Sequence, residues 1–156
     1  MNYFKLFELI PSYQLNQGDL HMKYLQLQKK YHPDNAESTT DQLAAVEQTI
    51  LINDAFDVLS NPVKLIEYYL DQQGIKLTDK QVQENLDQTE LLFLLDLQEQ
   101  FMDNPTKLNE YKAQIKVKIK DSTALLVNAI EQNSKQDIEQ NLAKVLFFSK
   151  SLKHMG

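Results

Sequence analysis

A scarcity of helix-breaking residues is the feature that most limits the folds open to this chain. The 156 residues include only 3 Gly and 4 Pro. Apolar residues recur three or four positions apart over long windows, and no alternating strand pattern persists. The breakers fall mainly at or near gaps in the helical patterns, at Pro11, Gly18, Pro33, Pro62, Gly74 and Pro105. The sequence therefore predicts an all-α fold.

The N-terminal half predicts a hairpin of two long helices flanked by two short ones. Asn16 is a favourable N-cap, with Asp19 three positions on. The helix that it starts should stop at His32, because Pro33 disfavours helical dihedrals in the residue before it. Antiparallel packing of the two long helices would leave residues 32–40 as an exposed connecting loop. The predicted helices cover residues 3–9, 16–31, 41–60 and 62–70.

The C-terminal half predicts a second helical unit. Gly74 and the segment 76–79 are typical of a join between two units, which places the domains at residues 1–74 and 75–156. Three helical patterns follow, and a three-helix bundle is the simplest arrangement for them. They cover residues 84–103, 106–131 and 135–153.

Composition and charge exclude several functions. The net charge is −6 and all 16 basic residues are Lys, which argues against nucleic-acid binding. The absence of Cys excludes disulfides and thiolate-held metals, and the three His residues lack metal-ligand spacing, so no metal or cofactor is predicted. Neither a signal peptide nor a membrane-spanning run is evident. A soluble cytoplasmic protein is predicted, with no membrane partner.

The tripeptide His32-Pro33-Asp34 is the most distinctive motif. A histidine beside a carboxylate is compatible with acid–base chemistry, but an exposed loop with no marked nucleophile argues against an enzyme. Taken alone, the tripeptide would be a plain turn. The preceding helix carries three lysines that form either a solvated face or a contact for an acidic partner. These lysines are Lys23, Lys29 and Lys30.

The helix predicted over 84–103 has more apolar residues than one buried face requires. Six of the seven residues 91–97 are apolar, and at about 100° per residue they divide between two sides. One side suits the bundle core, with Phe93, Leu94, Leu97 and Phe101. The other carries Leu91, Leu92, Leu95 and Met102, joined by Asp96 and Glu99. In the last helix, Phe147 likewise points away from the core position Val145.

This surplus face has two interpretations from periodicity alone. It is either a protein-binding surface with acidic residues at its edge, or a helix buried on two sides. In the second case it would pack against the N-terminal domain or against a dimer mate.

Residues 1–70 resemble a J-domain, the module by which co-chaperones activate DnaK-type ATPases. The resemblance combines Lys29-Lys30-Tyr31, the tripeptide, the run Ile52-Asn53-Asp54-Ala55-Phe56 and Asn61-Pro62. It implies that the loop and the lysines of the preceding helix bind the chaperone, while the J-protein itself performs no chemistry. Two residues depart from the family pattern, because Asn35 stands where Lys is common and Leu65 where Arg is common.

Nearly the whole chain is similar to the HscB family of iron–sulfur cluster assembly co-chaperones. The similarity adds Tyr3-Phe4, Leu6-Phe7, the tract 41–46 and a short helical C-terminal domain of the HscB oligomerisation type. It implies an L-shaped two-domain arrangement, an HscA- or DnaK-type chaperone partner and an IscU-like scaffold partner. The scaffold-binding residues implied are Leu91, Leu92, Leu95, Asp96, Glu99 and Phe147. These are the surplus positions that the helical wheel identifies.

The resemblance thus predicts an adaptor that binds the cluster scaffold, delivers it to the chaperone and stimulates the ATPase of that chaperone. Because the chain has no Cys, it would not ligate iron through thiolates and would instead deliver the scaffold. Two alternatives remain at this stage. One is a J-protein for another client, and the other is a helical interaction module whose tripeptide is only a turn.

Overall fold

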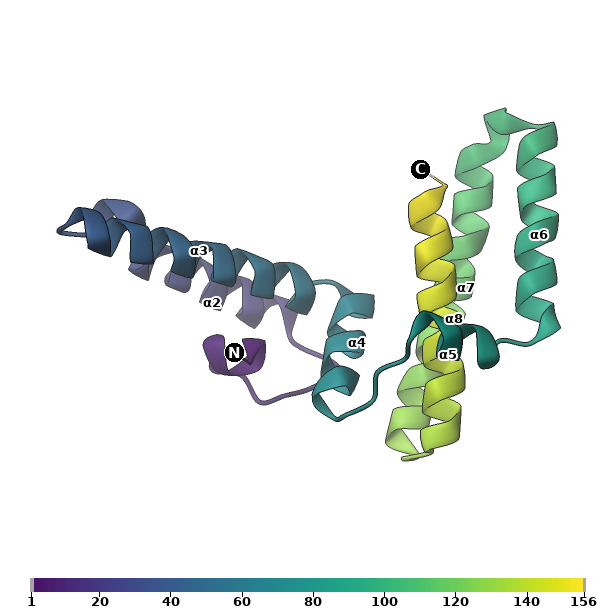
Figure 1. The fold of residues 1–156 in the computed structure, drawn as a ribbon, viewed down its shortest axis with the longest axis horizontal. Helices are drawn as coiled ribbons and strands as arrows, with labels where there is room; N and C mark the ends of the chain where they lie inside the picture. The colour runs from purple at the N-terminus through teal and green to yellow at the C-terminus, as the bar shows by residue number, and fades with distance from the viewer. Residues whose placement is uncertain (1, 156) are drawn as a thin grey trace. The chain divides into compact units, whose positions relative to one another are not determined.

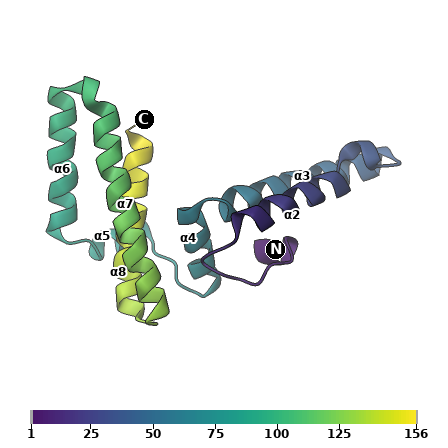
Figure 2. The same cartoon turned by 180° about the vertical axis from the view of Figure 1, so that it is seen from behind.

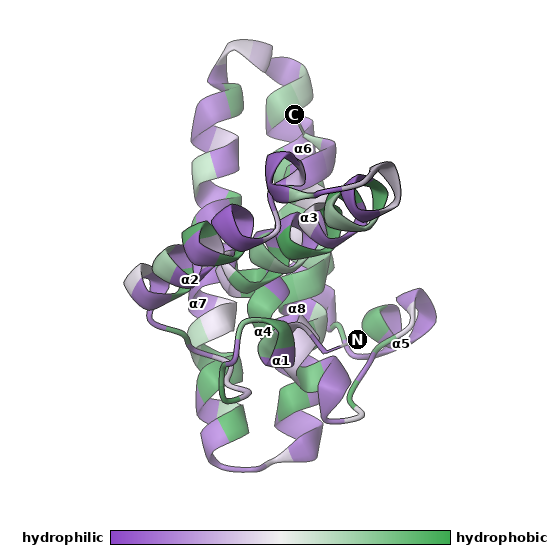
Figure 3. Cartoon of the chain, turned by 90° about the vertical axis from the view of Figure 1, so that its left-hand side faces the viewer, coloured by the Kyte–Doolittle hydropathy of each residue, from purple (hydrophilic) through white to green (hydrophobic). Residues whose placement is uncertain are grey.

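The computed structural model describes residues 2–155. The chain divides into two compact units, Met1–Gly74 and Ile75–Gly156. All regular secondary structure in that range is helical, so the all-α prediction is confirmed (Figure 1). The helices alternate between hydrophobic and hydrophilic stretches, as expected when each buries one face (Figure 3). Across residues 2–155, none of the helices has the length and apolar run that a membrane span needs.

The first unit is built around an antiparallel pair of helices. Helices α2 and α3 lie side by side in both views (Figures 1 and 2), and a single 3-10 turn connects them. The side chain of Asn16 caps α2 by accepting the backbone N–H of Asp19, as predicted, and Ser38 caps α3 in the same way. The elements are α1 (Tyr3–Leu6), α2 (Gln17–Lys30), η1 (Pro33–Asn35), α3 (Thr39–Leu59) and α4 (Pro62–Gln72).

The core of this unit comes from the apolar sides of α2 and α3 and from α1. On α2, Leu20 is buried and Tyr24 is half-buried, and the Tyr24 ring stacks on Phe56 of α3. The stacked rings of Tyr3 and Tyr68 hold α1 against α4. The buried cluster consists of Phe4, Phe7, Leu20, Ile52, Ala55, Leu59 and Leu65.

The second unit contains the predicted three long helices and one additional short helix. Helices α7 and α8 pack along their length, α6 lies beside α7, and α5 packs on α8. The elements are α5 (Asp79–Glu84), α6 (Gln88–Asp103), η2 (Pro105–Lys107), α7 (Leu108–Glu131) and α8 (Lys135–His154).

Aromatic side chains join α6 to the other two helices. The ring of Phe93 meets Phe148 of α8 edge-on, with 6.0 Å between ring centroids, and Phe101 meets Tyr111 of α7 in the same manner. The hydroxyl of Tyr111 donates to the carbonyl of Gln100 at 2.6 Å. These contacts fix which side of α6 is buried.

Two helix boundaries differ from the prediction for local reasons. The helix expected from residue 84 to 103 is interrupted, because capping boxes begin separate helices at Thr78 and Asp87. The helix expected over residues 3–9 ends at Leu6, since Glu8 has a positive φ of 54°. Lys23 of α2 donates to the Glu8 carbonyl at 3.1 Å and so stabilises this left-handed turn.

Candidate functional site

The His-Pro-Asp tripeptide forms a short 3-10 turn between α2 and α3. Pro33 occupies its first position, where a missing N–H costs nothing, and His32 is the N-cap. Nδ1 of His32 accepts the backbone N–H of Asp34 at 3.1 Å, so the neutral ring carries its proton on Nε2. The His32 and Asp34 side chains are 58% and 90% exposed, which leaves both available to a partner.

Asn35 anchors this turn to the helix before it. Its side-chain amide donates to the carbonyl of Lys29 at 2.8 Å, at the end of α2, where carbonyls lack helical partners. From α3, the hydroxyl of Thr49 reaches the carbonyl of Tyr31 at 3.3 Å. The sequence singled out Asn35 only as a departure from a family pattern. Its structural role was missed, although Asn favours such local bonds to the backbone.

The three predicted lysines do not form one cluster. Lys29 is exposed at the end of α2 beside the turn, whereas Lys30 lies over the ring of Tyr31, with Nζ 5.2 Å from the centroid. Lys23 is half-buried and is committed to the Glu8 carbonyl. The lysines adjacent to the turn are therefore the better placed for a partner.

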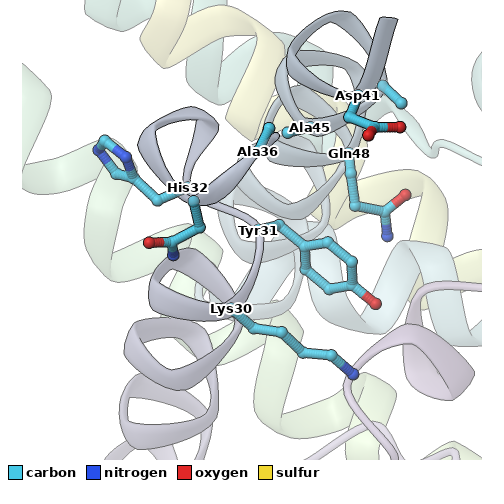
Figure 4. Close-up of a pocket in the computed structure, with 9 residues that line it drawn as sticks. Lys30, Tyr31, His32, Ala36, Asp41, Ala45 and Gln48 are labelled. Atoms are coloured by element: carbon cyan, nitrogen blue, oxygen red, sulfur yellow. The ribbon is translucent and has the colours of Figure 1, made fainter. Parts of the chain in front are cut away.

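A pocket of about 300 Å³ lies beside the turn. It is lined by the end of α2, the turn and the first turns of α3 (Figure 4). The imidazole of His32 points away from the Tyr31 ring and from the Lys30 ammonium in this view. The imidazole and Lys30 are therefore presented on different sides of the turn.

Removing the Asn35 anchor should loosen the turn. Asn35→Ala deletes one hydrogen bond, worth about 1 kcal/mol, and leaves the Lys29 carbonyl to water. We expect faster hydrogen exchange of the Asn35 and Ala36 amides, which bond to His32 and Pro33 within the turn. Glu37→Ala in the same exposed loop is the matched control and should leave these rates unchanged. Equal rates in Asn35→Ala and the wild type would contradict the anchoring role.

The predicted surplus face of α6 is exposed. Leu91, Leu92 and Leu95 are 43%, 62% and 56% exposed, whereas Leu94 and Leu97 on the opposite side are buried. Asp96 and Glu99 are exposed on the same outer surface, and the Asp96 carboxylate accepts from Gln100 at 2.9 Å. We call Leu91, Leu92 and Leu95 the α6 patch. Among the described residues of this unit, 75–155, the packing leaves these three side chains exposed.

Phe147, the predicted contribution of α8, lies at the edge of the core. Its ring is half-buried, packs against the bundle cluster and stands 5.4 Å from Phe148 between centroids. Phe147 therefore has a structural contact as well as an exposed part.

A largely buried ion pair fixes the start of α6. Glu90 accepts the backbone N–H of Asp87 through one carboxylate oxygen and meets Lys144 of α8 at 3.1 Å through the other. The Glu90 side chain is only 10% exposed. The capping pattern from Asp87 to Glu90 is readable in the sequence, but the link to Lys144 requires the fold. Leu91, the first residue of the α6 patch, directly follows Glu90, so this pair positions the patch.

Breaking that pair should destabilise the C-terminal unit. Lys144→Met leaves the Glu90 carboxylate buried without its cation, and we expect a loss of about 2 kcal/mol, less than for a fully buried pair because Lys144 is partly solvated. Urea denaturation monitored by circular dichroism measures this loss of stability. The matched control is Lys80→Met, which removes the exposed pair with Glu84 and should cost less than about 0.5 kcal/mol. Equal losses in the two variants would contradict this view.

Similarity to known proteins places the chain among the J-domain co-chaperones, the class that the tripeptide between α2 and α3 led us to expect. The HscB co-chaperone homologue of Aliivibrio salmonicida is 32% identical over 158 residues, which cover 96% of this chain and 92% of that protein. The chain belongs to the HscB co-chaperone family. No family model matches the chain.

Solved structures show the same fold. The crystal structure of human co-chaperone protein HscB matches with a TM-score of 0.83 and 24% identity, over 99% of this chain and 80% of that one. Chaperone HscB from Vibrio cholerae matches with a TM-score of 0.77 and 28% identity, over 99% and 95% of the two chains. Among residues 2–155, no group of three His, Asp or Glu residues is placed to hold a metal ion.

Proposed function

We propose that this chain is an adaptor in iron–sulfur cluster assembly. The α6 patch, with Asp96, Glu99 and Phe147, binds an IscU-like scaffold protein. The His32-Pro33-Asp34 turn, with Lys23, Lys29 and Lys30, binds a cytoplasmic HscA- or DnaK-type chaperone and stimulates its ATPase. The chain performs no catalysis of its own.

One observation carries the proposal: each compact unit exposes one group of side chains suited to binding a partner. In the first unit the Asp34 carboxylate is 90% exposed, an acceptor suited to a cation of the chaperone. The neighbouring Lys29 supplies a cation for an acidic area of the same partner. In the second unit the exposed leucines of the α6 patch stand beside Asp96 and Glu99, a combination suited to an apolar segment flanked by cations.

Joining the two features in one chain gives the adaptor its effect. A scaffold bound to the second unit is held near the chaperone bound to the first unit. Its effective concentration there is set by the link between the two units and requires no additional contact. The chaperone cycle would then release the cluster to acceptor proteins.

A retention experiment with the full chain tests the proposal. The chaperone is immobilised with ATP, and an IscU-type scaffold is added with or without the chain. We expect the chain to increase the amount of scaffold retained and to accelerate ATP hydrolysis.

The other outcomes identify the alternatives. Stimulation of the ATPase without binding of the scaffold would indicate a J-protein for another client. Absence of both activities would indicate a helical interaction module.

A further inference from the structure

Helices α6 and α8 run in the same direction along one edge of the bundle. Glu90 pairs with Lys144, and three residues further along α6 the ring of Phe93 meets Phe148. Residue numbers therefore rise together along the two helices, and their C-terminal ends lie at the same end of the bundle (Figure 1).

An apolar pocket of about 530 Å³ lies between those two ends. Phe101 and Met155 belong to the layer packed on the bundle core, while Met102 at the rim is 78% exposed. The flexible side chains of Met102 and Met155 adapt readily to the shape of an incoming side chain. The lining residues are Gln98, Phe101, Met102, Ser151, His154 and Met155.

This pocket continues the α6 patch along the bundle. At about 100° per residue, Leu91, Leu95 and Met102 lie within a sector of about 40° on α6. On α8, Phe147 and Ser151 are four residues apart and so share one side of the helix. The patch and the pocket therefore form one strip, and Leu91 and Met102 are about 16 Å apart along α6.

We propose that this pocket receives a second apolar side chain of the scaffold protein, beyond those that cover the α6 patch. The inference rests on the proposed function and extends its binding surface. It predicts a scaffold segment that carries two apolar groups about 16 Å apart, with cations facing Asp96 and Glu99.

Charge favours this occupant over a second copy of the chain. In a two-fold dimer formed through this strip, the same surface is used by both protomers. Asp96 and Glu99 of one copy would then face a surface with the same carboxylates, and such like-charge contacts are unfavourable.

Methyl NMR on the intact protein tests the pocket directly. The chain has four methionines, and labelling their methyl carbons gives a signal at each. On addition of unlabelled IscU-type scaffold, we expect the Met102 and Met155 signals to shift. Met22 lies in the first unit, is 61% exposed and serves as the internal control, which should not shift.

Affinity measurements complete the test. Met102→Ser should weaken scaffold binding about 5-fold, whereas Leu125→Ser, at a position 53% exposed on α7, should have no effect. The inference requires both the methyl shifts and the loss of affinity, and the absence of either overturns it. If Leu92→Ala still weakens binding in that case, the proposed function stands without the pocket. If no scaffold binding is measurable for the wild type, the proposed function fails as well.

Discussion

His32→Gln should abolish stimulation of the chaperone ATPase and leave the fold intact. His32 is exposed, and the hydrogen bond that its side chain makes is local, from the Asp34 amide to Nδ1. That bond orients the ring, so that Nε2–H is a donor in a fixed direction. Glutamine is longer and flexible, and it loses both the cap of the turn and the oriented donor.

The expected loss is at least about 10-fold in stimulation, which corresponds to about 1.4 kcal/mol of binding free energy in the activated complex. Steady-state ATP hydrolysis by an HscA- or DnaK-type chaperone, measured against increasing concentrations of the chain, provides the test. Circular dichroism should show an unchanged helix content, since the turn contributes no residue to the buried core.

A charge variant in the same loop separates the role of the turn from general electrostatics. Asp34→Asn removes the exposed acceptor charge and should also abolish stimulation, whereas Glu37→Gln removes another exposed charge three residues away and should retain it. Full stimulation by His32→Gln, or equal losses in Asp34→Asn and Glu37→Gln, would contradict the proposed role of the turn.

The fold was largely predictable because local signals agree with helical periodicity. Asn16 marks the start of α2, and Pro62 stands at the first position of α4. The break before α6 was also readable, since Asp87 and Glu90 have the spacing of a capping box, but the apolar run that follows obscured it. Periodicity identifies an apolar helix more readily than its first turn.

The side of α6 on which the patch lies was predictable for a similar reason, whereas its exposure was one of two alternatives that periodicity left open. A helix has a fixed rotation per residue, so Leu94 and Leu97 in the core force Leu92 to the outside. Contacts between residues far apart in the sequence leave no such periodic pattern. The bond from Lys23 to the Glu8 carbonyl depends on how the turn after α1 lies against α2 and could not be derived from the spacing of lysines.

Replacing Leu92 and Phe147 together by Ala should weaken scaffold binding about 30- to 150-fold. Burial of each side chain by a partner is worth about 1–1.5 kcal/mol, and a factor of ten corresponds to about 1.4 kcal/mol. Calorimetric titration of an IscU-type scaffold into the chain measures this change. Leu125→Ala on α7 is the matched control and should bind as the wild type does.

The two single variants should differ in stability. Leu92 is 62% exposed, so Leu92→Ala should change the free energy of unfolding by less than about 0.5 kcal/mol. Phe147 packs on Phe148, and Phe147→Ala should cost about 1–2 kcal/mol. A loss of affinity in Leu92→Ala therefore measures the contact with the scaffold and not a change in the stability of the bundle.

The double variant also tests whether the two contacts are separable. Leu92 and Phe147 belong to one compact unit and His32 to the other. Without scaffold, Leu92→Ala/Phe147→Ala should stimulate the chaperone ATPase as well as the wild type, while His32→Gln should bind the scaffold with unchanged affinity. Loss of both activities in either variant would contradict an adaptor with two independent contacts, because each substitution would then act on a single shared surface.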